Sequence, residues 1–208
     1  MNIAIVGATG NVGRKLIEVL EKKNFPVTEA YLVASQNSAG KKIHFLGKEH
    51  TVINLEEFDF SKVKIAFFAA GSAIAEKWAP IAAEKTIVID NSKFFRKDSE
   101  IPLIVPEVNS KELPKFKNKN IIANANCSVI PIVVALKPLH DLYNVKRIVA
   151  STYQSVSGAG KAGMDELISQ TKEVLENKNV HSKNFTKQIA FNAIPVSYTH
   201  LTLPTIGC

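Results

Sequence analysis

Cysteine, methionine and tryptophan are scarce in this 208-residue sequence, which has two, two and one of them respectively. The two cysteines, Cys127 and Cys208, form no disulfide framework, and such sparing use of cysteine fits a reducing compartment. No apolar run reaches the roughly 20 residues that a membrane-spanning helix needs. The first residues enter a strand pattern without a basic region or a cleavage site, so we expect no signal peptide and a cytoplasmic location.

The charge distribution argues against a nucleic-acid partner. The net charge is +7, but the lysines are scattered along the chain and are not interleaved with aromatic residues on one stripe. Solvated surface is therefore the better interpretation of most of them. The five histidines form no recognisable motif, and the sequence predicts no metal site.

A glycine-rich turn follows the first predicted strand. Residues 2–6 are an apolar strand, and Gly7, Gly10 and Gly13 then lead into a helix with apolar residues at helical spacing. Glycines at these positions let the backbone approach a pyrophosphate, whose charge the helix N-terminus stabilises. A purely structural turn has the same local pattern, but its position after the first strand favours dinucleotide binding.

The second predicted strand, residues 29–34, lacks the acidic residue that usually follows it in folds specific for NAD. Asn37 and Ser38 stand there instead, and Lys41 and Lys42 come next. Small polar groups beside lysines suit a 2′-phosphate, so the sequence favours NADP, although the same residues also suit an ordinary loop. A hairpin is expected around Gly47, with arms at 43–45 and 50–53.

Further buried strands are expected at residues 64–69, 86–89 and 121–123, with a helix at 73–84 between the first two. The segment 102–109 lies between prolines, so it can form only a short edge strand or an extended segment. Arg96 follows the 86–89 strand, and alone it is either an anion clamp or a surface arginine.

Cys127 lies between the 121–123 strand and apolar residues that recur at helical spacing. The start of a helix stabilises a thiolate, which a thiol nucleophile requires. A buried structural cysteine is the alternative. After this helix, we expect a strand at 145–153, a glycine loop at 158–160 and a helix at 164–175.

Seven segments, in order along the chain, resemble aspartate-semialdehyde dehydrogenase: GATGNVG, NSAGKK, FFRKD, VPEVN, NANCS, STYQSVSGAGKAG and IAFNAIP. The resemblance implies a doubly wound, Rossmann-like α/β cofactor domain at residues 1–126, then the beginning of a truncated α+β substrate and dimerisation domain at 127–195. It also implies that NADPH reduces L-aspartyl 4-phosphate to the semialdehyde, for lysine, threonine and methionine synthesis. Homodimers or homotetramers are expected of the full-length family.

The resemblance assigns roles to individual residues. Cys127 is the nucleophile that forms a thioacyl enzyme, Arg96 and Asn126 bind phosphate, and Gln154 lies beside the substrate. The positions that match cofactor contacts are Gly7, Thr9, Gly10, Asn11, Val12, Gly13, Asn37, Ser38, Ser157 and Gly158.

Three departures from the family pattern qualify this interpretation. Ala125 replaces a usual proline, and Asn37 replaces a frequent arginine, which weakens the case for NADP. Residues 196–208 do not match the family and resemble a non-native tail. We therefore expect this chain to catalyse little by itself. The alternatives are a reductase of N-acetylglutamyl phosphate and an inactive nucleotide-binding fragment.

Overall fold

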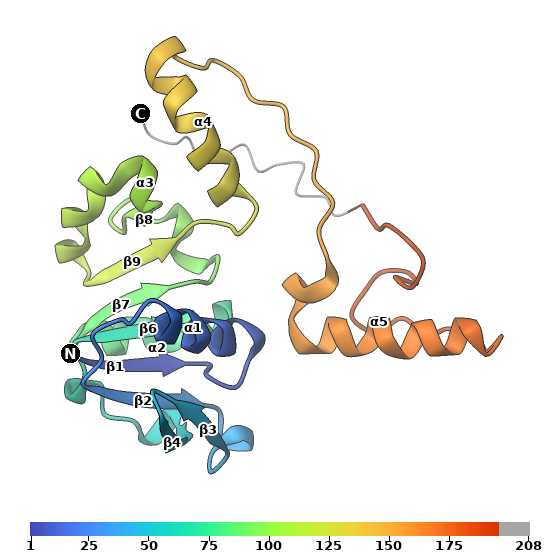
Figure 1. Cartoon of the computed structure of the whole chain (residues 1–208), viewed down its shortest axis with the longest axis horizontal. Helices are drawn as coiled ribbons and strands as arrows, with labels where there is room; N and C mark the ends of the chain where they lie inside the picture. Colours follow the sequence, from blue (N-terminus) through green and yellow to red (C-terminus); the bar gives the residue numbers. More distant parts are fainter. Residues whose placement is uncertain (196–208) are drawn as a thin grey trace. The chain divides into compact units, whose positions relative to one another are not determined.

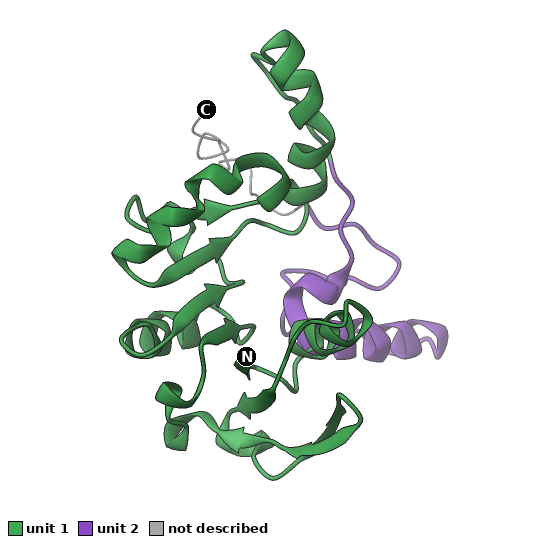
Figure 2. Ribbon diagram, turned by 60° about the vertical axis from the view of Figure 1, so that its left-hand side comes forward, with its two compact units in different colours: residues 1–151 green, residues 152–208 purple. Residues whose placement is uncertain are grey.

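The computed structural model describes residues 1–195 in two compact units, Met1–Ser151 and a second unit from Thr152 onward (Figure 2). The tail expected at 196–208, which contains His200 and Cys208, lies outside the described residues. Within the described part, no helix is long and apolar enough to cross a membrane.

The first unit is built on a seven-stranded sheet (Figure 1). Every neighbouring pair of strands in it is parallel. The strand order is β5-β2-β1-β6-β7-β9-β8. The strands are β1 (Asn2–Val6), β2 (Glu29–Ala34), β5 (Ile53–Asn54), β6 (Ile65–Phe68), β7 (Ile87–Asp90), β8 (Leu103–Ile104) and β9 (Ile121–Asn124).

Helices cover both faces of this sheet, because its strands are apolar on both sides. On β1, Ile3 and Ile5 share a core with Ile17 and Leu20 of helix α1 (Asn11–Lys22). The alternate β1 residues pack with the alanines of helix α2 (Ser72–Ala83) in a second core. This arrangement confirms the predicted doubly wound α/β fold.

Most strand predictions for this unit are confirmed to within one or two residues. The hairpin consists of β3 (Lys42–Phe45) and β4 (Lys48–Thr51), whose turn residues Leu46 and Gly47 both have positive φ. β8 is the short edge strand expected between the prolines. The remaining short helices of this unit are η1 (Gln36–Ser38), η2 (Leu55–Glu57), η3 (Phe60–Lys62), η4 (Phe94–Lys97), α3 (Pro106–Asn109) and η5 (Ser110–Asn118).

The strand expected at residues 145–153 is wrong. After helix α4 (Val129–Tyr143), this segment has no regular secondary structure, and within residues 1–195 no strand pairs with it. Val149 and Tyr153 are 81% and 97% exposed. A β-branched pattern favours an extended backbone, but a strand also requires a hydrogen-bonded neighbour.

The second unit is organised by helix α5 (Gly160–Leu175), which follows the short helix η6 (Val156–Ala159). Two buried polar residues one helical turn apart, Glu166 and Gln170, hold the segment that returns along α5. Gln170 accepts hydrogen bonds from the backbone N–H groups of Ile189 and Ala190, at 2.8 and 3.2 Å. Its amide nitrogen donates to Glu166 and to the carbonyl of His181.

Glu166 completes the same network by accepting hydrogen bonds from the backbone N–H groups of Lys183 and Asn184, at 2.9 and 2.6 Å. Burial acts to raise the pKa of Glu166, but these hydrogen bonds, with others from Asn184 and Phe185, outweigh it and lower the pKa. Glu166 therefore holds its partners as a carboxylate.

Candidate active site

The candidate residues of the first unit lie at one edge of the sheet. The glycine turn follows β1, Arg96 follows β7 and Cys127 follows β9. These strands are parallel, so their carboxyl ends meet at the same edge. Ligands of open α/β sheets bind at this edge, where the order of the strands reverses. Here the reversal is between β1 and β6.

The glycine turn has the geometry of a nucleotide cradle. Gly7 has φ +88°, and a Cβ there would lie 2.6 Å from the carbonyl oxygen of Ala69, at the end of β6. A Cβ on Gly13 would lie 2.2 Å from the carbonyl oxygen of Gly7. The backbone is therefore closely packed at both glycines. Gly10 is the N-cap residue of α1, so the helix begins with no side-chain cap and no acidic residue in its first turn. An uncapped helix start of this kind suits a pyrophosphate.

The loop after β2 meets this turn. The hydroxyl of Thr9 donates to the hydroxyl of Ser38 at 3.3 Å, and the amine of Lys41 donates to the same Ser38 oxygen at 3.4 Å. Asn37 is exposed in η1. Lys41 therefore brings a positive charge to the loop in which the sequence lacks the family's frequent arginine, while Asn11 and Val12 begin α1 as expected.

Cys127 lies in a tight turn between β9 and α4, as predicted, and its side chain is exposed. The preceding residue, Asn126, forms this turn: its side-chain oxygen accepts from the Ser128 N–H at 2.9 Å. Its carbonyl oxygen accepts from the N–H groups of Val129 and Ile130, at 3.0 and 3.1 Å. An exposed thiol at the start of α4 is available to a substrate, in contrast to a buried structural cysteine.

Arg96 spans the ends of two neighbouring strands. Its Nε donates to the carbonyl oxygen of Asn124 at 2.9 Å, and its Nη2 donates to the carbonyl oxygen of Asn91 at 3.2 Å. A guanidinium has five N–H groups, so three remain for an anion. Burial lowers the pKa of Arg96, while the charges of Asp90 and Cys127 act to raise it. Arg96 is thus partly buried and held by two backbone carbonyl oxygens, which favours the anion clamp over a surface arginine.

The turn that carries Arg96 begins at a buried carboxylate. Asp90 is fully buried at the end of β7 and accepts hydrogen bonds from the N–H and the hydroxyl of Ser92, at 3.0 and 2.6 Å. The Ser92 oxygen in turn accepts from the Phe94 N–H at 3.1 Å. Phe95, the second residue of η4, is buried in the core. The short helix is therefore held by the hydrogen bonds at its N-terminal end and by the packing of Phe95.

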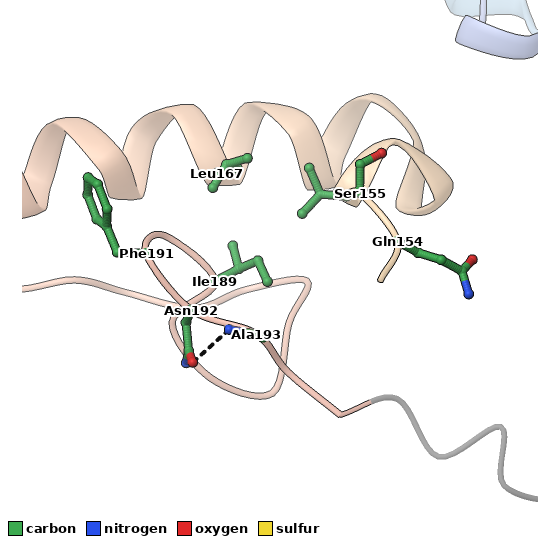
Figure 3. Close-up of a pocket in the computed structure, with 8 residues that line it drawn as sticks. Gln154, Ser155, Leu167, Ile189, Phe191, Asn192 and Ala193 are labelled. Atoms are coloured by element: carbon green, nitrogen blue, oxygen red, sulfur yellow. Dashed lines mark hydrogen bonds between the residues drawn. The ribbon is translucent and has the colours of Figure 1, made fainter. Parts of the chain in front are cut away.

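Three other predicted residues belong to the second unit. Gln154 precedes η6, while Ser157 and Gly158 lie within it. Gln154 and Ser155 line a hollow of about 620 Å³, with Val156, Leu167, Ile189, Phe191, Asn192 and Ala193. Leu167 and Ile189 face one another across it, and the Gln154 side chain extends away from them (Figure 3).

Comparison with known proteins identifies the family. The sequence model of the semialdehyde dehydrogenase NAD-binding domain matches residues 2–116, which is more than half of the chain, and that of the semialdehyde dehydrogenase dimerisation domain matches residues 136–202. This chain belongs to the semialdehyde dehydrogenase family. Residues 2–116 of this semialdehyde dehydrogenase chain therefore include its dinucleotide-binding domain, in agreement with the glycine turn.

Individual relatives carry a more specific name. Aspartate-semialdehyde dehydrogenase 2 of Vibrio cholerae is 54% identical over 195 residues, and aspartate-semialdehyde dehydrogenase of Aquifex aeolicus is 51% identical over 196. Each match covers 93% of this chain and 58% of the relative. The chain therefore spans less than two thirds of the length of these semialdehyde dehydrogenases.

Solved structures of the family agree with the fold. A crystal structure of Vibrio cholerae aspartate semialdehyde dehydrogenase II complexed with ASA has a TM-score of 0.91 and 54% identity, covering 94% of this chain and 58% of that one. The Candida albicans enzyme with NADP has a TM-score of 0.53 and 26% identity, covering 69% and 48%.

Two residues of this candidate site escaped the sequence analysis. Asn91 and Asn124 hold Arg96 through their carbonyl oxygens and are joined by a side-chain hydrogen bond of 2.7 Å. Each is a polar residue at the carboxyl end of a buried strand, and that position was the available signal.

Proposed function

We propose that the whole protein converts L-aspartyl 4-phosphate to L-aspartate 4-semialdehyde and phosphate, with NADPH as reductant and Cys127 as nucleophile; this chain covers 58% of the length of the Vibrio cholerae relative. The observation that carries this proposal is the exposed Cys127 thiol in the turn before α4, at the same edge of the sheet as Arg96. The family assignment and the names of the relatives support the choice of substrate.

In the proposed first step, the Cys127 thiolate attacks the acyl carbonyl carbon. A carbon–sulfur bond forms, the carbon–oxygen bond to phosphate breaks, and phosphate leaves with the electron pair of that bond. The free N–H groups of the Arg96 guanidinium would neutralise charge on the departing phosphate, and the Asn126 amide nitrogen would donate a hydrogen bond to it. The product is a thioester on Cys127, which divides the reaction into two easier steps.

NADPH, when bound, supplies the hydride that reduces this thioester to the aldehyde and releases the Cys127 thiolate. The glycine turn would hold the pyrophosphate of NADPH at the start of α1. Only glycine fits at Gly7 and Gly13, because a Cβ at either position would clash with neighbouring backbone atoms. Thr9, Ser38 and Lys41 would hold the 2′-phosphate that distinguishes NADPH from NADH. The resemblance also assigns Gln154 to the substrate and Ser157 and Gly158 to the cofactor, and we propose the same roles for them here.

We further propose a homodimer in the cytoplasm. The match of residues 136–202 to the family's dimerisation domain supports self-association. A nucleophile that must remain a free thiol needs a reducing compartment, which supports the cytoplasm. Light scattering on the purified protein gives the mass of the assembly directly.

The proposal is tested by mass spectrometry and by kinetics. Incubation with L-aspartyl 4-phosphate should add the aspartyl group to the peptide that contains Cys127, and NADPH should remove it as aldehyde. In the reverse direction, NADP reduction should require both the semialdehyde and inorganic phosphate. Cys127→Ser should abolish the adduct, while Cys208→Ser, the matched change at the other cysteine, should leave it intact. An adduct that persists in Cys127→Ser would overturn the assignment of the nucleophile.

A further inference from the structure

The ends of β7 and β9 are joined by a side-chain hydrogen bond beyond their backbone ladder. The last paired residues of the two strands are Asp90 and Ala123. One residue further, the Asn124 amide nitrogen donates to the Asn91 side-chain oxygen at 2.7 Å. Both side chains are partly buried. The side-chain bond therefore links Asn91, the first residue after β7, to Asn124, the last residue of β9, whose main chain is still paired with β8.

The same two residues provide both acceptors for Arg96. The guanidinium donates from Nε to the Asn124 carbonyl oxygen and from Nη2 to the Asn91 carbonyl oxygen. Because a guanidinium is planar, two hydrogen bonds to separate strands fix both its position and its direction. The spacing of those two carbonyl oxygens depends on how the strand ends are held together.

We propose that Asn91 and Asn124 are positioning residues that orient Arg96 toward the phosphate of the substrate. Their side-chain hydrogen bond fixes the distance between the two carbonyl oxygens, and these oxygens direct the three remaining guanidinium N–H groups. Neither asparagine needs to touch the substrate. The inference rests on the proposed function, because it assumes that Arg96 binds phosphate.

Loss of the hydrogen bond between the Asn91 and Asn124 side chains should weaken phosphate binding without affecting the glycine turn. The probe is inorganic phosphate, and the measured quantity is the concentration that half-protects Cys127 from alkylation by iodoacetamide, followed on the Cys127 peptide by mass spectrometry. In Asn124→Ala that concentration should rise roughly threefold to tenfold, the effect expected from one hydrogen bond. NADP affinity should stay within twofold of the wild type.

Two comparisons separate positioning from a general structural effect. Asn109→Ala is the matched control, because Asn109 also makes two side-chain hydrogen bonds, to the Val105 N–H and the Leu103 carbonyl, beside a neighbouring strand. It should leave phosphate protection unchanged. In an Arg96→Ala background, Asn124→Ala should have no further effect. Asn91→Ser removes the same hydrogen bond from the other side and replaces Asn124→Ala if that variant does not fold.

The outcomes distinguish the two proposals. If phosphate protects the wild type and protects Asn124→Ala or Asn91→Ser equally well, the positioning inference is wrong and the proposed function stands. If phosphate protects neither the wild type nor Arg96→Ala, the phosphate site of the proposed function is wrong, and the inference is overturned with it.

Discussion

A side-chain carbon on Gly13 would lie 2.2 Å from the carbonyl oxygen of Gly7, so the first turn of α1 rests directly on the glycine turn. Gly13→Ala should therefore push the helix away from the turn. We expect a loss of about 1–3 kcal/mol of stability, the usual cost of overpacking. Because the displaced turn is the proposed pyrophosphate cradle, NADP affinity should fall as well. Urea unfolding and cofactor titration measure the two effects.

Gly10→Ala provides a graded comparison for this prediction. A Cβ on Gly10 would lie 3.3 Å from the Gly7 carbonyl oxygen, and the residue has an ordinary φ of −78°. The stability of the Gly10→Ala variant should lie between the stability of the wild type and that of Gly13→Ala. Equal stability of the two variants would show that the short Gly13 contact relaxes freely.

The contact between the Lys41 amine and the Ser38 hydroxyl leads to a prediction about how the protein distinguishes NADP from NAD. Lys41→Ala should weaken NADP about tenfold, the value of one charge-assisted hydrogen bond, and leave NAD unchanged because NAD has no 2′-phosphate. Lys42→Ala is the control, since the Lys42 amine pairs with Glu49 at 2.6 Å. A parallel loss of NADP and NAD affinity in Lys41→Ala would contradict this role.

The buried Asp90 carboxyl predicts a pH dependence of stability. Burial raises the pKa of Asp90, although the hydrogen bonds from Ser92 and the charge of Arg96 oppose this. A raised pKa in the folded state means that the stabilising contribution is present at low pH and is lost as the pH rises through that pKa. Asp90→Asn does not ionise, so its stability relative to the wild type should increase as the pH rises above the ordinary aspartate pKa of about 4.

Asp59→Asn should show the opposite trend in the same experiment. Hydrogen bonds from the N–H and the hydroxyl of Ser61 lower the pKa of Asp59, so its contribution is present at neutral pH and is lost as the pH falls. Relative to the wild type, Asp59→Asn should therefore become less stable as the pH rises. Denaturant unfolding at several pH values tests both variants, and identical slopes would refute the assignment for Asp90.

Gln170 holds the return segment of the second unit, so its removal should loosen that segment first. In Gln170→Ala the N–H groups of Ile189 and Ala190 lose their acceptor. We expect their hydrogen exchange to accelerate at least tenfold, the effect of losing about 1.4 kcal/mol or more per buried group. Ser169→Ala, which removes a surface hydrogen bond to Glu173 on the same helix, is the control. Unchanged exchange in Gln170→Ala would rule out this role.

Local sequence patterns were sufficient for the parts of the fold that depend on local chemistry. β1, β2 and the hairpin follow from apolar runs and turn residues, and the glycine turn follows from its spacing. Cys127 was correctly placed between a strand and a helix for the same reason. Each of these features is encoded within about ten neighbouring residues.

Features that depend on distant partners could not be predicted in this way. β9 pairs with β7 although β8 lies between them in the sequence, so nothing local brings Asn124 to Asn91. The strand expected at 145–153 is wrong for a related reason, because residue type indicates an extended backbone but does not provide a neighbouring strand.

The candidate site and the positions suited to chemical attachment lie at opposite edges of the parallel sheet. The candidate residues of the first unit follow the carboxyl ends of their strands, so the amino ends of β6 and β7 lie at the opposite edge. Lys64, exposed just before β6, and Lys85, exposed just before β7, are on that side. A surface tether on a single cysteine introduced at either position should immobilise the protein with its candidate site facing away from the surface.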